Sequence, residues 1–284
     1  MLKKLFLYLV VCLTAAAATS NLAFAQNAIL YVSPNRVTLT PDENISVLNV
    51  SNQSEEERRY DLTMVEQVMT TEGLTQRLEQ FEYSARRMLR FVPKRFTLKP
   101  GERQTVRVMA KRPATLEDGD YHSHLLFREI PVENKSKADL EEERNKSGRA
   151  QFDIRAIYGV AVPIIVQKGN ITSEMVLSDV NYIPASDGAP AHLAVTMNRT
   201  GNAEASSRLK IIYQPASGDE VTLVNNLWIP IYREVDTVTK RFPLTEISGG
   251  LRGGKVILTL SKETGNRLPD GSPELITQTK EVSF

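Results

Sequence analysis

Apolar and polar residues alternate along most of this chain, in short segments that are separated by turn residues. In Thr105–Ala110, for example, Val106 and Val108 alternate with Arg107 and Met109. A period of two places successive side chains on opposite faces of a strand, so such segments predict β-strands with one buried face. The first half of the chain contains roughly seven such segments, at the spacing typical of an antiparallel sandwich. They are Ile29–Thr40, Ile45–Asn52, Tyr60–Met69, Leu89–Leu98, Thr105–Ala110, Tyr121–Ile130 and Arg149–Val166.

The longest alternating segment, Arg149–Val166, follows a charged stretch, Glu133–Gly148, that has almost no apolar residue. Such a stretch cannot bury enough surface to offset its ordering entropy, so we expect a mobile loop there. The long strand then has two interpretations. It is either the last strand of a sandwich domain, which the pattern alone favours, or a strand at a sheet edge that pairs with another protein.

A second β-rich unit follows the short polar linker Gln167–Asn170 and is predicted to be a smaller sandwich. Helical periodicity is nearly absent, so the expected fold class is all-β, with domains over residues 26–166 and 167–284. The strands expected in the second domain are Glu174–Ile183, Ala191–Asn198, Arg208–Gln214, Glu220–Trp228, Ile231–Arg233, Val256–Ser261 and Glu274–Phe284.

The N-terminus carries the features of a secretory signal peptide over residues 1–25. Lys3 and Lys4 precede the apolar run Leu5–Ala18, and Ala23-Phe24-Ala25 supplies a small-x-small pattern before Gln26. The apolar run is short for a bilayer span, so cleavage is expected rather than a membrane anchor. We therefore predict an exported protein without stable membrane insertion.

Cysteine and charge restrict the mature chain further. Cys12 is the only cysteine and lies inside the apolar run, so the mature chain has no internal disulfide and no cysteine nucleophile or metal ligand. The formal net charge of +1 becomes −1 when Lys3 and Lys4 are removed with the signal peptide. A nearly neutral chain argues against nucleic acid as a partner and against a polybasic membrane role.

Candidate catalytic groups are few. His122 and His124 share one face of an expected strand, as a pair of metal ligands could. His192 lies in the other domain and no acidic ligand obviously converges on the pair, so we expect ordinary strand surface, with no metal and no cofactor. Motifs such as a Gly-x-Ser-x-Gly elbow, a Gly-rich phosphate loop or a His-Glu-x-x-His helix are absent from the sequence. An enzyme is therefore disfavoured, although a carboxylate pair could still assemble in three dimensions, and Trp228 with the tyrosines of the second domain could line a sugar-binding face.

Several motifs of the first domain keep the order and spacing of one known family. They are Ser33–Val37, Leu48–Asn52, Arg90–Gly101, Val106–Val108 and Leu126–Pro131. From Ile29 to about Val166 the chain resembles the periplasmic pilus chaperones of the chaperone–usher pathway, the PapD-like family.

The resemblance implies two immunoglobulin-like domains in a boomerang arrangement with a cleft between them. Members of this family act in the periplasm, without ATP, on pilus or fimbrial subunits that lack their last strand. The chaperone lends its own strand to the subunit and delivers the complex to an outer-membrane usher. The lent strand covers a hydrophobic groove and unpaired backbone groups that would otherwise promote aggregation.

The resemblance also implies roles for individual residues. Arg36 falls where the family places the arginine that binds the C-terminal carboxylate of the subunit, a task that suits a bidentate guanidinium. The alternative is an ordinary surface arginine. The family's second anchor, a lysine in the donor strand, is absent between Arg149 and Gln167, and we take Arg155 as its substitute. The expected donor side chains are Phe152, Ile154, Ala156 and Tyr158, of which Phe152 and Ile154 are favoured as partner-facing.

Three further residues match structural positions of the family. Arg107 and Glu129 stand where the family makes a charged contact between its domains, and Pro93 stands where it often has a cis proline. Glu129 shares a row with Leu125 and Phe127, so an unpaired carboxylate there would be costly.

Two other classes of protein remain open at this point. A structural pilus subunit or surface adhesin would also be built of sandwich domains, but Gln26–Ala28 is too short to be its donor strand. A periplasmic carbohydrate-acting enzyme would need a converged pair of carboxylates in a cleft.

Overall fold

The computed structural model describes residues 29–131, 157–186, 188–245, 247, 250, 251, 253–268 and 272–284. The signal peptide, the charged stretch Glu133–Gly148 and the expected donor and anchor residues Phe152, Ile154, Arg155 and Ala156 lie outside the described residues. All regular elements inside these ranges are β-strands. Over the same ranges, no helix has the length and apolar character needed to cross a membrane.

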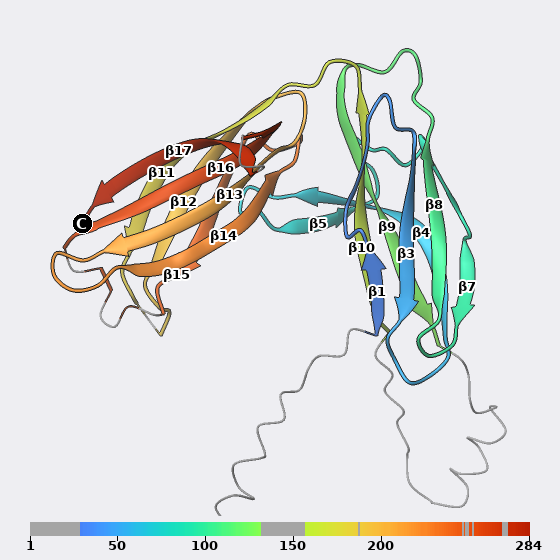
Figure 1. Ribbon diagram of the computed structural model, residues 1–284, viewed down its shortest axis with the longest axis horizontal. Coiled ribbons are helices and arrows are strands. Elements are labelled where there is room, and N and C mark those ends of the chain that lie inside the picture. The colour runs from blue at the N-terminus through green and yellow to red at the C-terminus, as the bar shows by residue number, and fades with distance from the viewer. Residues whose placement is uncertain are drawn as a thin grey trace, which may run out of the picture.

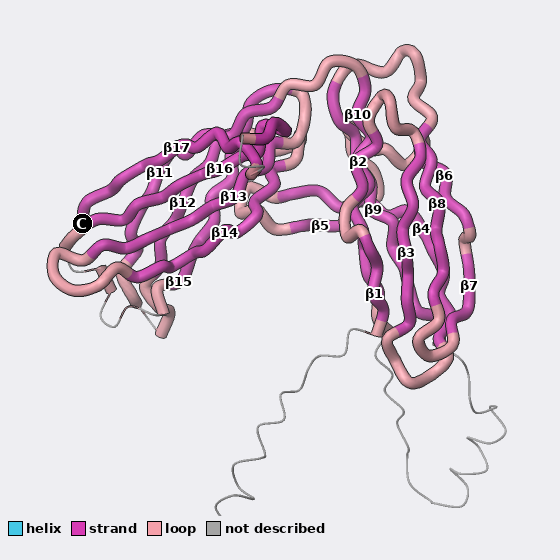
Figure 2. The backbone as a smooth tube through the Cα atoms, in the orientation of Figure 1, coloured by secondary structure: helices cyan, strands magenta, loops and turns pink. Residues whose placement is uncertain are grey.

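The strands form two separate bodies set at an angle, and the chain crosses between them at one end (Figures 1 and 2). Each body consists of two sheets packed face to face around its own hydrophobic core. This confirms the expected fold class of two immunoglobulin-like β-sandwich domains in a boomerang arrangement.

The first domain packs a four-stranded sheet against a six-stranded sheet. The four-stranded sheet has the order β1 (Leu30–Ser33), β3 (Ile45–Asn52), β8 (Arg103–Ala110) and β6 (Leu89–Val92). The six-stranded sheet has the order β2 (Val37–Leu39), β10 (Gly159–Lys168), β9 (Gly119–Ile130), β4 (Arg58–Met69) and β5 (Thr75–Leu78), and β7 (Arg95–Leu98) pairs with another part of β4.

The alternating pattern explains which face of each strand is buried. On β8, Val106 and Val108 are fully buried, whereas Thr105 and Arg107 between and beside them are exposed. On β10, Ile164 lies in the same core. Burial of each such side chain stabilises the fold by about 1.5–3 kcal/mol.

The described part of the first domain has ten strands, because two of the seven expected strands each divide between the two sheets and one further strand is present. Ile29–Thr40 breaks near Pro34 into β1 and β2, and Leu89–Leu98 breaks near Pro93 into β6 and β7. The peptide bonds Ser33-Pro34 and Val92-Pro93 are both cis. Proline cannot donate to a strand ladder, so it suits the points where the chain leaves one sheet for the other. The additional strand, β5, is exposed along its whole length and has no apolar row that would predict it.

The second domain packs a three-stranded sheet against a four-stranded sheet. The first has the order β11 (Ser173–Ile183), β12 (His192–Gly201) and β15 (Thr237–Pro243), and the second has the order β14 (Val221–Ile231), β13 (Ala205–Gln214), β16 (Lys255–Arg267) and β17 (Pro273–Ser283). The expected strand Ile231–Arg233 is wrong, because Ile231 ends β14 and the chain then turns toward β15.

The end of β4 and the whole of β5 form a hairpin, Glu66–Leu78, that reaches from the first domain to the second and is here called the interdomain hairpin (Figure 1). Met69 is buried in the hydrophobic core of the second domain. The N–H of Thr239 on β15 donates to the carbonyl of Thr71 at 2.8 Å, and Lys240 Nζ donates to the carbonyl of Gly73 at 3.1 Å. The hairpin therefore joins the two domains through both apolar and backbone contacts.

Candidate functional site at the domain junction

Arg36 lies between β1 and β2, and its side chain extends to the surface where the two domains meet. Its Nη2 donates to the carboxylate of Glu204, which precedes β13 in the second domain. The guanidinium also lies over two aromatic rings, 5.0 Å from the centroid of Trp228 and 5.6 Å from that of Tyr232. Aromatic faces attract a guanidinium and restrict its orientation. Arg36 remains 22% exposed, so it is held in place but still accessible to solvent.

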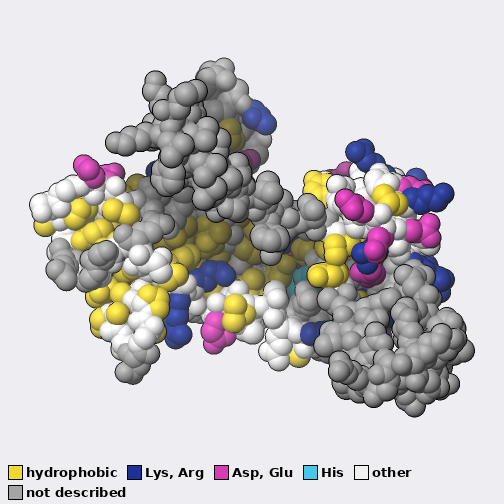
Figure 3. Space-filling model, turned by 90° about the horizontal axis from the view of Figure 1, so that it is seen from below, with side chains coloured by type: hydrophobic (Ala, Val, Ile, Leu, Met, Phe, Trp, Pro, Cys, Tyr) yellow, Lys and Arg dark blue, Asp and Glu magenta, His cyan; other side chains and the backbone are white. Residues whose placement is uncertain are grey.

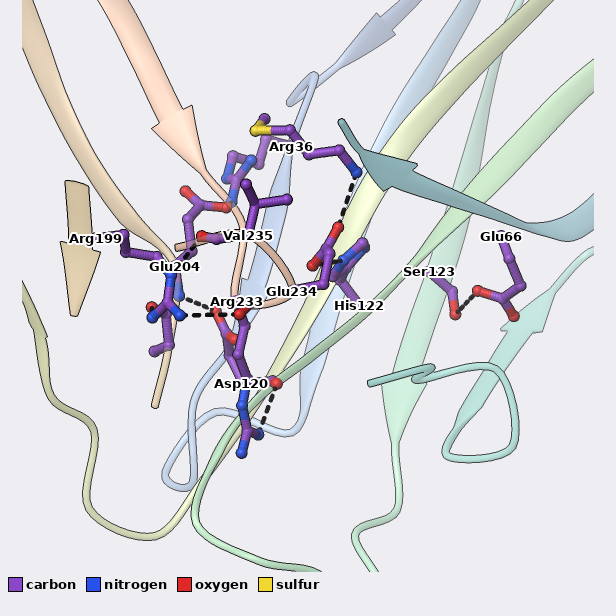
Figure 4. A network of polar contacts seen from close by, with 12 residues as sticks. Arg36, Glu66, Asp120, His122, Ser123, Arg199, Glu204, Arg233, Glu234 and Val235 are labelled. Carbon is purple, nitrogen blue, oxygen red and sulfur yellow. Dashed lines mark hydrogen bonds and ion pairs between the residues drawn. The ribbon is translucent and has the colours of Figure 1, made fainter. Parts of the chain in front are cut away.

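Glu204 is held by the first domain on its backbone as well as on its side chain. Its N–H donates to Asp120 Oδ2 on β9 at 2.7 Å, and Asp120 is itself buried. Burial raises the pKa of the Glu204 carboxyl to about 7, against the opposing effect of the Arg36 charge. Burial likewise raises the pKa of Asp120. Two carboxyl groups thus meet at the junction, and Arg36 is paired with that of Glu204 (Figure 4).

The backbone at the start of β9 approaches the second domain closely. The N–H of Asp120 donates to the carbonyl of Asn202 at 3.2 Å, and the Arg233 side chain donates to the carbonyl of Asp120 at 3.3 Å. Gly119 has a φ of +142°, and a Cβ there would lie 2.5 Å from the Asn202 carbonyl oxygen. Only glycine fits this approach without displacing the second domain.

His122 and His124 are buried, so the expectation that they form ordinary strand surface is wrong. His122 Nε2 lies 3.1 Å from Glu234 Oε2 of the second domain, and its ring stacks on Tyr232 at 4.4 Å. Burial lowers the pKa of His124 to about 4. Burial acts to raise the pKa of Glu234, but the hydrogen bond and the charge of His122 lower it overall. Among the described residues, no group of three or more His, Cys, Asp or Glu side chains is arranged to hold a metal ion.

Glu129 and Arg107 do not meet in the described structure. Glu129 Oε1 accepts from Arg58 Nη1 at 2.5 Å within the first domain, which pairs one oxygen of the carboxylate, while Oε2 is buried without a hydrogen-bond partner in the described structure. Arg107 is exposed on β8, in the other sheet. Among the described residues, the side-chain ion pairs between the domains are Arg36 with Glu204 and, when the histidine is protonated, His122 with Glu234; the sequence predicted neither of them.

The strand β10 forms an incompletely paired edge of the six-stranded sheet. It pairs with β9 along its whole length, Gly159–Lys168, but on its other side the described partner β2 covers only Ile164–Val166. Just before β10, Ile157 and Tyr158 are 56% and 55% exposed. At the start of β10, backbone groups are therefore not covered by β2, and the apolar side chains just before it are exposed to solvent. The same segment lines a small apolar pocket, which is formed by Ile29, Leu30, Tyr60, Tyr158, Gly159 and Val160.

The surface between the domains is hollowed and carries a concentration of hydrophobic side chains. Figure 3 shows these side chains in the hollow, with basic side chains and a histidine at its margin. The junction around Arg36 supplies charge and aromatic rings to the same region of the molecule. Such a surface suits a protein partner with an apolar segment and a carboxylate.

No family model matches the sequence, and no curated protein matches it. Among solved structures, the YadV chaperone is similar over 89% of this chain and 100% of its own, with 10% identity and a TM-score of 0.45. A chain of the CsuC–CsuE chaperone–tip adhesion subunit complex from Acinetobacter baumannii is similar over 88% of this chain and 98% of its own, with 14% identity and a TM-score of 0.45. The periplasmic chaperone SfaE is similar over 89% of this chain and 98% of its own, with 10% identity and a TM-score of 0.39. In each case the similar region extends over both domains.

Proposed function

We propose that this protein is a periplasmic chaperone for pilus or fimbrial subunits. It binds a subunit that lacks a strand, supplies the missing strand from its own chain, and passes the complex to an outer-membrane usher without ATP. The observation that carries the proposal is the open edge at the start of β10 together with an accessible arginine at the domain junction.

The open edge supports strand donation. A partner strand placed beside Gly159–Pro163 would find backbone groups that β2 does not cover. If the alternation of side chains continues from Val162 and Tyr158 toward the N-terminus, Ala156, Ile154 and Phe152 share one face of the strand. They would then be the donor side chains for the partner's groove. Each large apolar side chain so buried would contribute on the order of 1.5–3 kcal/mol.

Arg36 supports capture of a subunit's C-terminal carboxylate. The guanidinium is fixed by Trp228 and Tyr232, so little side-chain entropy is lost when a carboxylate binds. A charge-assisted hydrogen bond of this kind contributes about 1.5–3 kcal/mol. Arg155 is proposed as the second cation that holds the same carboxylate.

The test is co-expression with candidate pilus subunits in a periplasm, followed by purification of the soluble complex. The wild-type chain is expected to yield a one-to-one complex. Arg36→Ala should weaken it by roughly ten- to a hundredfold, because the carboxylate loses its charged partner. Phe152→Ser combined with Ile154→Ser should abolish it.

The matched control variants carry the same kinds of substitution at positions outside the proposed contacts. Arg95→Ala removes an exposed arginine of the same domain that pairs with Asp61, and Gln151→Ser with Asp153→Ser changes the opposite row of the donor segment. Both controls should bind like wild type. Folded Arg36→Ala and Phe152→Ser/Ile154→Ser proteins that hold subunits as firmly as wild type would refute the mechanism.

A further inference from the structure

The position that a partner's carboxylate would take at Arg36 is already occupied by a carboxylate of the same chain. Arg36 Nη2 donates to Glu204, and the Glu204 side chain is only 9% exposed. The pair joins the two domains, since Arg36 precedes β2 and Glu204 precedes β13. Any external carboxylate must therefore share the guanidinium with Glu204 or displace it.

Both acidic and basic groups act on the Glu204 carboxyl. Asp120 Oδ2 accepts from the Glu204 N–H, and Asp120 Oδ1 is buried without a hydrogen-bond partner in the described structure.

Tyr232 contacts Arg36 from the other side, and His122 on β9 is directed to Glu234. Arg36 is thus the cation that pairs with Glu204, while Arg233 is directed to the Asp120 backbone and to the rings of Tyr83 and Tyr121.

We propose that Glu204 is an internal competitor for Arg36 and that it takes up one proton from solvent when a partner's terminal carboxylate binds. This inference rests on the proposed function, because it concerns the same guanidinium. Glu204 would thereby determine the affinity and the pH dependence of carboxylate capture.

The physical reason is the cost of a buried negative charge. In the free protein Arg36 and Glu204 form a neutral pair. A second carboxylate bound to Arg36 would lie beside Glu204, and two ionised carboxylates on one guanidinium repel each other strongly in a site that is largely removed from water. Protonation of Glu204 removes that repulsion and leaves the guanidinium to the incoming carboxylate. The carboxyl of Glu204 is prepared for this step, because burial already raises its pKa to about 7.

The sign of the pH dependence follows from proton uptake. Binding raises the pKa of Glu204 further, so the complex holds more protons than the free chain between the two pKa values. Affinity therefore falls as pH rises above about 7, by up to about tenfold per pH unit for one proton. Below that range Glu204 is neutral in both states, and it contributes no pH dependence.

The experiment measures the dissociation constant of the co-purified pilus subunit from pH 6 to pH 9. Wild type is expected to weaken steadily above pH 7. Glu204→Gln, which mimics the neutral acid, should bind at pH 8.5 about tenfold more tightly than wild type and should show a flat profile over this range. Glu204→Asp keeps an ionisable carboxyl and should keep the pH dependence, whereas Glu174→Gln, an exposed glutamate of the same domain, should match wild type.

The outcomes separate this inference from the proposed function. If the subunit binds in an Arg36-dependent manner but Glu204→Gln has the affinity and pH profile of wild type, Glu204 is not a competitor and the chaperone function stands. If the wild-type chain binds no subunit, or Arg36→Ala binds as wild type does, the proposed function fails and this inference fails with it.

Discussion

His124 and Glu204 are two buried ionisable groups whose pKa values shift in opposite directions. Burial lowers the pKa of His124 from 6.5 to about 4, so the stability that its neutral form contributes is lost as pH falls through that range. Burial raises the pKa of Glu204 from 4.5 to about 7, so the stability that its neutral form contributes is lost as pH rises through that range. Between about pH 4.5 and 6.5 the two groups therefore change the free energy of unfolding with pH in opposite directions.

Single substitutions should reveal how each group alone makes the free energy of unfolding depend on pH. Glu204→Gln should make the free energy of unfolding fall as pH decreases from 6.5 toward 4, by on the order of 3 kcal/mol, because the effect of Glu204, which opposes that of His124, is then removed. His124→Gln should make it fall instead as pH rises from 4.5 to 7, by a similar amount. Urea unfolding at several pH values measures both. Parallel pH profiles for wild type and the two variants would show that the pKa shifts are absent.

The interdomain hairpin contributes one buried methionine to the second domain, in addition to the backbone contacts of Thr71 and Gly73. Met69 lies in the core of the second domain although it belongs to β4 of the first. Its N–H donates to Glu234 Oε1 at 2.9 Å, and Glu234 in turn contacts His122 on β9. The hairpin, the histidine and the glutamate thus form one continuous contact between the domains.

Truncation of Met69 should weaken this contact. Met69→Ala is expected to reduce the free energy of unfolding by about 2–5 kcal/mol, because it leaves a cavity in a packed core. It should also split denaturant unfolding into two transitions, one for each domain. Leu74→Ala at the exposed turn of the same hairpin is the control and should change stability by about 0.5 kcal/mol or less. One cooperative transition of unchanged midpoint for Met69→Ala would contradict this role.

The elements that the sequence predicted are those in which one face carries the apolar row. β3, β8 and β12 were predicted because their alternation reflects burial on one side. β9 was predicted from its apolar row, although its first seven residues are buried on both faces. β5 was missed because all four of its residues are exposed, and its pairing with β4 comes from the hairpin rather than from a core. β15 was missed because its sequence, Thr237–Pro243, has few apolar residues; it is placed in the sheet by its antiparallel pairing with β12.

The junction could be predicted only in part, because half of it comes from the other domain. The motif around Arg36 identified the arginine. The other three residues are distant from Arg36 in sequence: Glu204 lies between β12 and β13, Trp228 lies within β14, and Tyr232 follows β14. No pattern in the sequence indicates that they meet Arg36. The two histidines were expected on the surface because the second domain that covers them could not be anticipated from one strand.

At the scale of the whole molecule, the first domain is expected to depend on the second. An isolated chain of residues 26–169 would expose Met69 and leave His122 and Arg36 without their partners. It should therefore bind more of a hydrophobic dye than the full mature chain and self-associate in size-exclusion chromatography. Addition of separately purified residues 170–284 should reduce both effects. An isolated first domain that is monomeric and as stable as the full chain would contradict this dependence.

The interdomain hairpin also restricts how this protein can change through evolution. A domain that contributes part of its neighbour's core cannot be exchanged for a related domain as an independent module. A substitute second domain would need a cavity for Met69, an edge strand that donates to Thr71, and an acid that meets Arg36. The two domains are therefore expected to diverge as a pair, with compensating substitutions at the hairpin and at the junction rather than by recombination between them.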